Sequence, residues 1–292
     1  MSRVLIGLAI LAVAVGICWG VVVTGQAHGG RWITTLIGAA RMGIPPLVET
    51  VFNVLVFVPL ILIAVIAAAF ERRNALAPGR RAAAGLGIGL LVGLGGLSTA
   101  VLYAKLAGTL ADGVSTGATA TLLAWGAGVV LLQTAAEEIY FRGWLQPALT
   151  VRWGQVAGIV AGALAFGALH VAGGAREPLS LLNLFLGGLM FGLFAARSGG
   201  LATAIGAHFA WNAAEQLGWG LDPNPGIGPF GAAVDKELVG ATMWGGSTEG
   251  LNGSIGMTIV LLAILLPLVL LSWRRLPAAA MPVTARPVAA VS

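Results

Sequence analysis

Two adjacent glutamates, Glu137 and Glu138, stand in a markedly apolar part of this chain, after a stretch that begins near Leu122. Arg142 follows four residues after Glu138. A charged side chain inside hydrocarbon costs on the order of 2.5–3.5 kcal/mol by insertion scales, so ionisable residues in a membrane segment indicate a function. If the segment is helical, Glu138 and Arg142 share a face and can pair. Glu137 then points about 100° away and is left to accept a proton.

Two further polar groups lie downstream in equally apolar surroundings. His170 follows Phe166 by four residues, and Asn212 follows His208 by four. The chain has three histidines, and these two lie inside apolar segments. Together with the glutamate pair, the two imidazoles and the amide are the groups needed to activate a water molecule and to stabilise a developing oxyanion.

Each group also has a structural interpretation. The Glu138–Arg142 pair can be an ion pair near a helix end, and a lone histidine in a helix is more often a packing residue than a catalyst. His208 and Asn212 can form an interhelical hydrogen bond worth about 0.6–2 kcal/mol. The sequence lacks His-Glu-x2-His, Gly-x-Ser-x-Gly and the Walker motif, so zincin, serine-hydrolase and nucleotide-driven functions have no motif to support them.

Composition places these residues in a membrane. The chain is 58% hydrophobic and 9% charged, whereas a soluble domain carries roughly 25% charged residues. Its 292 residues suffice for about eight crossings of ~20 residues each. We therefore predict an all-α, polytopic membrane helix bundle of about eight transmembrane helices. The predicted segments are 4–24, 46–70, 83–103, 118–140, 155–172, 179–196, 200–217 and 255–273.

Glycine spacing predicts how these helices pack. Small residues four apart let two backbones approach closely in a membrane. The chain has 44 glycines, and three pairs have this spacing. They are Gly89 and Gly93, Gly158 and Gly162, and Gly188 and Gly192. The single cysteine, Cys18, excludes an internal disulfide and a multi-cysteine metal site.

The distribution of arginine predicts the orientation. The net charge of +5 comes mainly from arginine, and in a membrane protein it bears on topology and lipid contact rather than on nucleic acid. Four arginines lie within 71–81, and more follow in the tail from Arg274. The positive-inside rule therefore places both termini and the 71–81 loop in the cytoplasm. Arg31 and Arg41, in the first outer loop, are the two arginines that count against this orientation. The apolar run 4–24 is too long for a signal-peptide core of about 7–15 residues, which makes it a first transmembrane helix.

The three motifs together resemble the signature motifs of the CAAX protease and bacteriocin-processing family (CPBP, or Abi) of intramembrane proteases. The resemblance covers about 137–216 and includes the words Glu-Glu-Ile-Tyr-Phe-Arg-Gly-Trp-Leu-Gln and Ala-His-Phe-Ala-Trp-Asn-Ala. The motifs, in the order of the family, are Glu137-Glu138-x3-Arg142, Phe166-x3-His170 and His208-x3-Asn212. The resemblance implies an intramembrane endopeptidase whose site lies in a cavity between helices.

The resemblance also implies a role for each site residue. These roles are water activation by Glu137 and His170, oxyanion stabilisation by His208 and Asn212, and support of the geometry by Glu138 and Arg142. The family is commonly called a metalloprotease family, and Glu137, His170 and His208 could supply a two-histidine, one-carboxylate zinc site. The same residues serve a metal-free water activated by a glutamate, and the sequence leaves both alternatives open.

On this interpretation the chain has four parts: N-terminal transmembrane helices (1–117), a CPBP-type catalytic core (118–217), an extracytoplasmic loop (218–254), and a last transmembrane helix with a basic tail (255–292). The expected partners are the lipid bilayer and a peptide or protein substrate that is membrane-associated or lipidated, with no nucleic acid. The family's eukaryotic members remove three residues after a prenylated cysteine. The preference for arginine over lysine and the abundance of Ala, Gly and Val suggest a bacterial inner membrane, where prenylated substrates are not the default expectation.

Two other functions use the same residues. A proton- or ion-coupled transporter also buries Glu, His and Arg, but such transporters often carry paired repeats, and the first half has no second Glu-Glu motif. A non-catalytic membrane scaffold would use the clusters as structural contacts. The depth of the site depends on the fourth segment: a straight helix keeps Glu137 about 20 Å from a turn near 150–154, whereas a break at Gly143 or Pro147 brings it closer.

Overall fold

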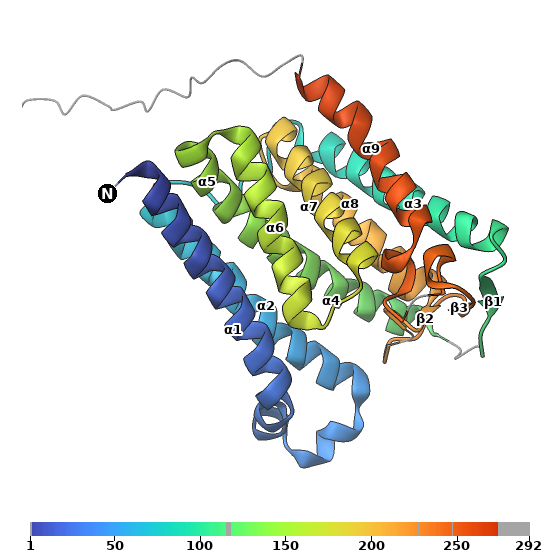
Figure 1. The fold of residues 1–292 in the computed structure, drawn as a ribbon. Coiled ribbons are helices and arrows are strands. Elements are labelled where there is room, and N and C mark those ends of the chain that lie inside the picture. The colour runs from blue at the N-terminus through green and yellow to red at the C-terminus, as the bar shows by residue number, and fades with distance from the viewer. Residues whose placement is uncertain (1, 115–117, 227, 247, 274–292) are drawn as a thin grey trace, which may run out of the picture.

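The structure is a computed structural model that describes residues 2–114, 118–226, 228–246 and 248–273. The basic tail predicted from Arg274 onward lies outside this part of the chain. Helices account for most of the described residues (Figure 1). They are α1 (Arg3–Ile37), α2 (Pro45–Phe70), α3 (Ala82–Leu106), α4 (Ala120–Glu138), α5 (Gln146–Trp153), α6 (Gln155–Gly173), α7 (Pro178–Ser198), α8 (Ala202–Ala213) and α9 (Ile255–Trp273).

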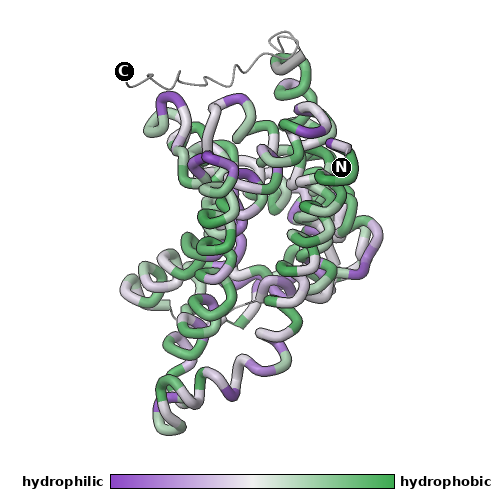
Figure 2. The backbone as a smooth tube through the Cα atoms, turned by 90° about the vertical axis from the view of Figure 1, so that its left-hand side faces the viewer, coloured by the Kyte–Doolittle hydropathy of each residue, from purple (hydrophilic) through white to green (hydrophobic). Residues whose placement is uncertain are grey.

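The helices confirm the predicted fold class, an all-α polytopic membrane bundle. Within the described residues, six helical spans are long and apolar enough to cross a membrane, the fourth being the continuous run Ala120–Trp153. The segment Ile255–Leu271 within α9 is apolar but shorter, and α8 has 12 residues. Hydrophobic residues dominate the helices in Figure 2. Each of the eight predicted segments is helical, and the chain is a multi-pass membrane protein.

The fourth predicted segment does not break at Gly143 or Pro147. Instead α4 continues through a π-helical segment, η2 (Ile139–Leu145), directly into α5. The backbone N–H of Gln146 bonds to the carbonyl of Phe141, five residues back. Pro147 then falls in the first turn of α5, directly after the π-helical segment, where it supplies no N–H to the preceding turn. The helical run is therefore continuous, and measured along it Glu137 lies about 20 Å from the α5–α6 turn.

Two other features differ from the predicted elements. Helix α1 runs to Ile37, well beyond the predicted end at residue 24. A small sheet joins β1 (Leu110–Asp112), β2 (Leu221–Asp222) and β3 (Lys236–Leu238) in the order β1-β3-β2. Strand β3 pairs antiparallel with β1 and parallel with β2. The sheet fastens the long 218–254 loop to the connection between α3 and α4, and strands this short leave no periodic signal in the sequence.

Glycine brings α8 into backbone contact with α3. A Cβ atom added to Gly89 would lie 2.3 Å from the carbonyl oxygen of Thr203, and one added to Gly93 would lie 2.2 Å from that of Ala207. A Cβ on Gly188 of α7 would similarly lie 3.0 Å from Ala163 of α6. The predicted packing role of these spacings is confirmed, and it fixes α8, which carries the third motif, against the bundle.

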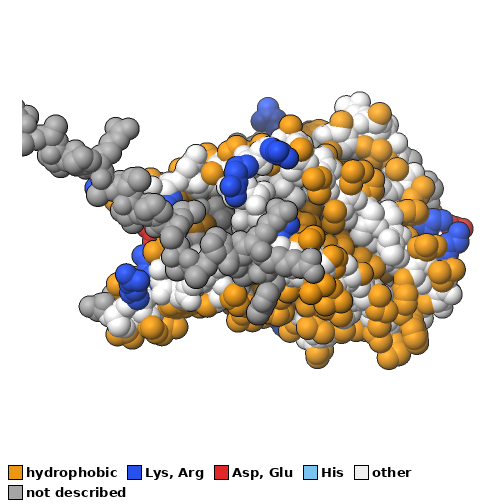
Figure 3. Space-filling view, turned by 90° about the horizontal axis from the view of Figure 1, so that it is seen from above, with side chains coloured by type: hydrophobic (Ala, Val, Ile, Leu, Met, Phe, Trp, Pro, Cys, Tyr) orange, Lys and Arg blue, Asp and Glu red, His pale blue; other side chains and the backbone are white. Residues whose placement is uncertain are grey.

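The two ends of the bundle differ in charge. At one end, Arg152 in the last turn of α5 pairs with Glu71 at 2.9 Å, and the backbone N–H of Arg80 bonds to the carbonyl of Ser198. Figure 3 views this end, where Lys and Arg side chains stand out at several places and acidic ones at few. The opposite end carries the small sheet and the 218–254 loop (Figure 1).

Candidate functional site

The first and third motifs meet at one buried carboxylate. Oxygen Oε1 of Glu138 accepts hydrogen bonds from Nη1 of Arg142 at 2.9 Å and from Nδ1 of His208 at 2.8 Å. Glu138 is 0% exposed and Arg142 is 3% exposed. A carboxylate only accepts, so Nδ1 of His208 carries the shared hydrogen and Nε2 faces the other way. The predicted pair at i and i+4 therefore forms, and it also orients the histidine of a third helix.

Glu137 lies on the opposite side of the same imidazole. Its Oε2 is 3.8 Å from Nε2 of His208, which is too long for a hydrogen bond. Glu137 is 3% exposed, and this oxygen has no hydrogen-bond partner among the described residues. Buried polar atoms are nearly always partnered in folded proteins. An unpaired carboxylate oxygen at this depth is suited to accept from a water molecule or from a substrate group.

The second motif presents an imidazole with an available lone pair. Nδ1 of His170 lies 3.0 Å from the carbonyl oxygen of Phe166. Because a carbonyl only accepts, Nδ1 carries the hydrogen and Nε2 keeps its lone pair. The Phe166 ring lies between the two motif histidines, with its centroid 4.5 Å from that of His170 and 5.8 Å from that of His208.

An aromatic and backbone cage holds the buried guanidinium. Nη2 of Arg142 donates to the carbonyl of Gly188 at 3.0 Å, and its Cζ lies 4.6 Å from the Phe166 ring centroid. Phe191 of α7 lies 5.4 Å from the same Cζ and stacks on His208 at 4.5 Å between centroids. Such contacts stabilise a desolvated cation by roughly 2 kcal/mol. Sequence reasoning missed Phe191 and Gly188, because an apolar residue in an apolar helix carries no signal of its own.

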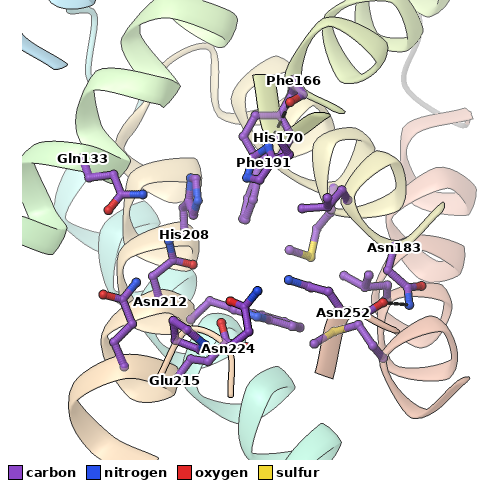
Figure 4. Close-up of a pocket in the computed structure, with 18 residues that line it drawn as sticks. Gln133, Phe166, His170, Asn183, Phe191, His208, Asn212, Glu215, Asn224 and Asn252 are labelled. Carbon is purple, nitrogen blue, oxygen red and sulfur yellow. Dashed lines mark hydrogen bonds between the residues drawn. The ribbon is translucent and has the colours of Figure 1, made fainter. Parts of the chain in front are cut away.

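A cavity of about 230 Å³ adjoins this cluster. His170, His208 and Asn212 line it, so the second and third motifs face one space, as Figure 4 shows. Glu137, Glu138 and Arg142 lie outside its wall, behind His208. His208 is thus the one motif residue that both touches the carboxylates and faces the cavity.

The far part of the cavity is polar in a way that the sequence analysis did not anticipate. Glu215 and Gln216 follow Asn212 on a second π-helical segment, η3 (Ala214–Trp219), and both line the space. Other amide side chains complete this lining, namely Gln133, Asn183, Asn224 and Asn252 (Figure 4). Glu215 could have been found by the argument that selected Glu137, since it is an acid inside the apolar segment 200–217.

The three residues proposed for zinc do not gather around one point. Among the described residues, no group of three or more His, Cys, Asp or Glu side chains is placed to hold a metal ion. Glu137 approaches His208, whereas His170 lies across the Phe166 ring. We therefore derive no chemical step through a metal, and the zinc alternative stays a prediction for the chelation experiment below.

The fold and the cluster define a membrane helix bundle with buried carboxylates and imidazoles beside an internal cavity. Residues 119–214 match the family model of the type II CAAX prenyl endopeptidase, Rce1-like. This match contains all six predicted site residues and bears out the resemblance to the CAAX protease family over this third of the chain. No curated protein and no solved structure matches the chain.

Proposed function

We propose that the protein is an intramembrane endopeptidase that hydrolyses peptide bonds of membrane-associated or lipidated substrates. The family match supports an intramembrane endopeptidase in general. The observation that carries the residue assignment is the arrangement around His208. Its Nδ1 is held by the Glu138–Arg142 pair, its Nε2 faces the unpartnered oxygen of Glu137, and its ring faces the cavity.

In the proposed reaction, Glu137 and His170 activate the attacking water, and one of them takes a proton from it. The water oxygen bonds to the peptide carbonyl carbon, and the proton passes to the amine nitrogen as the C–N bond breaks. Nε2 of His170 has the lone pair that this requires. Glu137 lies behind His208 rather than on the cavity wall. It therefore reaches a water in the cavity either by turning its side chain or by taking the proton through Nε2 of His208.

The oxyanion would be stabilised from α8. The side-chain amide of Asn212 lines the cavity one turn after His208 and can donate to the developing charge. His208 can donate as well when Nε2 carries a proton, since Nδ1 stays bonded to Glu138. Arg142 holds Glu138 in place and takes no part in the bonds that form and break.

The charge distribution supports a cytoplasmic location for both termini and for the 71–81 connection. The described arginines of this end include Arg72, Arg73, Arg80 and Arg81, and Glu71 is the acid that pairs there. The positive-inside rule assigns such an end to the cytoplasm. Asn224, Pro225 and Asn252 of the opposite end line the cavity. Substrate access from the extracytoplasmic side follows, in what we take to be a bacterial inner membrane.

The test is cleavage of a panel of fluorogenic peptides and lipopeptides by purified protein. Glu137→Gln should lower cleavage by about 10²–10⁴-fold, the usual contribution of a general base, while the protein still folds. The matched control is Glu237→Gln, which removes an acid of strand β3 away from the cavity. Equal cleavage by wild type and Glu137→Gln would remove Glu137 from the mechanism.

The same assay with a chelator decides between the two forms of the mechanism. Activity that chelation leaves intact supports a water activated by glutamate and histidine alone. Activity that is lost with chelator and restored by zinc supports the two-histidine, one-carboxylate site.

A further inference from the structure

Glu215 is a buried carboxyl group that has no partner among the described residues. It is 7% exposed, lies in η3 and lines the cavity. Within the described residues it forms no hydrogen bond and no ion pair. Burying an ionisable group without compensation is costly. A carboxyl group of this kind at a cavity wall is suited to bind a ligand.

The surroundings of Glu215 supply no positive charge. Figure 4 shows it beside Asn224 and below Asn212, both of which carry neutral amides. Among the described residues, no Lys or Arg lines the cavity. Gln216 and Trp211, which also line the cavity, are neutral as well. Within the described residues the cavity therefore offers the ionised form of Glu215 no counter-charge, and a cationic group of a ligand would supply one.

The distance between Glu215 and the proposed catalytic residue His208 determines which substrate residue Glu215 would contact. His208, Asn212 and Glu215 occupy successive turns of one continuous helical run and all line the cavity. At 1.5 Å per residue, Glu215 lies about 10 Å along the helix from His208. An extended peptide covers about 3.3 Å per residue, so this distance corresponds to about three substrate residues.

We infer that Glu215 forms a subsite for a cationic nitrogen of the substrate, about three residues from the bond to be cleaved. The nitrogen belongs either to a Lys or Arg side chain or to a free α-amine, and the inference rests on the proposed endopeptidase function. A peptide whose C-terminal carboxylate reaches this subsite is repelled by like charge. The subsite therefore favours cleavage beside a basic residue over removal of a short, acid-ended tail.

The 218–254 loop borders this end of the cavity through Asn224, Pro225 and Asn252. Between residues 218 and 254 it has four acids and one lysine. The acids are Asp222, Asp235, Glu237 and Glu249, and none of them lines the cavity. Among the described lining residues, Glu215 is therefore the acid that a cationic group in the cavity would meet.

The first experiment measures kcat/KM for peptides that differ at one position, occupied by Lys, norleucine or Glu, two to four residues from the scissile bond on either side. Wild type should prefer Lys over norleucine at one position by about 10–100-fold, as for a hydrogen bond to a charged group. Glu215→Gln should abolish this preference, whereas Glu237→Gln should keep it. Acetylated and free-amine peptides separate the side-chain source from the α-amine source.

The second experiment measures binding without turnover. Fluorescence anisotropy of the same labelled peptides would use Glu137→Gln in nanodiscs, with and without Glu215→Gln. Preferential binding of the Lys peptide that depends on Glu215 supports the subsite even if no peptide is cleaved, which separates its outcome from that of the proposed function. Equal binding of Lys and norleucine peptides, or a Lys preference that survives Glu215→Gln, overturns it. Glu215→Met, which also removes the carboxyl group, replaces the glutamine variant if the latter does not fold.

Discussion

Glu138 and Glu215 are both buried carboxyl groups in an apolar bundle, yet their surroundings differ. Glu138 accepts hydrogen bonds from Arg142 and His208 and lies outside the cavity wall. Glu215 lines the cavity, and the described residues offer it no partner. Two donors of the protein hold Oε1 of Glu138 away from the cavity, although its Oε2 has no partner among the described residues, and this makes Glu138 a fixed support. A carboxyl group that faces the cavity without a partner is available to a ligand. The partners of a buried acid, rather than its burial, therefore indicate its role.

A π-helical segment accompanies each of the two glutamates. Segment η2 begins at Ile139, directly after Glu138, and η3 begins at Ala214, directly before Glu215. An i→i+5 hydrogen bond widens the helix and shifts the faces of the residues that follow, and such segments are frequent at functional sites. The two acids thus stand where their helices change register.

The largest effect is expected from breaking the buried pair between Glu138 and Arg142. Arg142→Met leaves Glu138 buried beside a neutral side chain, so the free energy of unfolding should fall by about 3–5 kcal/mol. The measurement is reversible unfolding in mixed detergent micelles. Arg152→Met is the matched control, because it breaks the partly exposed pair with Glu71 and should cost less than about 1 kcal/mol. Similar losses of unfolding free energy in both variants would contradict the expectation that the buried pair contributes more than the partly exposed one.

Removing both charges separates stability from activity. Glu138→Leu combined with Arg142→Met should recover most of the lost free energy of unfolding, since apolar residues often replace a buried ion pair without cost. Cleavage should stay low, because Nδ1 of His208 has then lost its acceptor.

A smaller effect comes from moving the helix that carries both His208 and Glu215. Gly93→Ala places a Cβ within 2.2 Å of the carbonyl of Ala207, and overpacking of this kind costs about 1–3 kcal/mol. Ala207 precedes His208, so cleavage should fall along with stability. Gly95→Ala, where nothing lies within 4 Å of the added Cβ, should be neutral or stabilise the helix by about 0.5–1 kcal/mol. Equal unfolding free energies for the two variants would show that α3 and α8 tolerate separation.

Removing the carboxyl group of Glu215 should change the free energy of unfolding in the opposite direction. Glu215→Gln replaces a buried carboxyl group that has no partner among the described residues, so the free energy of unfolding should stay unchanged or rise by about 1 kcal/mol. Glu138→Gln in the same assay should lower it by several times this amount, because Arg142 loses its counter-charge. A large loss from Glu215→Gln would show that the protein itself supplies a partner to this acid.

Much of the fold could be predicted from the sequence because a bilayer permits few solutions. Backbone groups in hydrocarbon must be satisfied within the segment, so each long apolar run had to be a helix, and the eight segments are helical. The end of α1, the two π-helical segments and the small sheet depend on contacts between distant residues. Those contacts leave no periodic pattern, and Pro147 was read as a break although it begins a helical turn.

The site was predictable where its contacts are local. The Glu138–Arg142 pair follows from helical spacing, and the structure confirms it. The bond from His208 to Glu138 joins residues 70 positions apart, and nothing in the sequence fixes which carboxylate the imidazole meets. The roles of Glu137 and His170 stay predictions that the cleavage assay decides.

The smallest expected effect concerns the loop that borders Glu215, and it depends on pH. Burial raises the pKa of Glu249, but hydrogen bonds from Ser180 and from the backbone N–H groups of Arg176 and Glu177 outweigh it, so the pKa lies below its ordinary value of 4.5. The unfolded form therefore takes up its proton first. The stabilisation is present above about pH 4.5 and is lost as pH falls through the folded value.

Amide hydrogen-exchange protection factors of residues 174–177, compared between pH 6 and pH 4, measure this loss. They should fall toward acid in wild type and stay low at both pH values in Glu249→Gln, while protection around Glu138 is unchanged in either protein. Glu249 belongs to the 218–254 loop, which borders the cavity near Glu215, and takes no part in the Glu138–Arg142 ion pair. Acid should therefore loosen the ligand-facing side of the molecule first. Equal pH dependence in wild type and Glu249→Gln would assign the anchoring of this loop to other contacts.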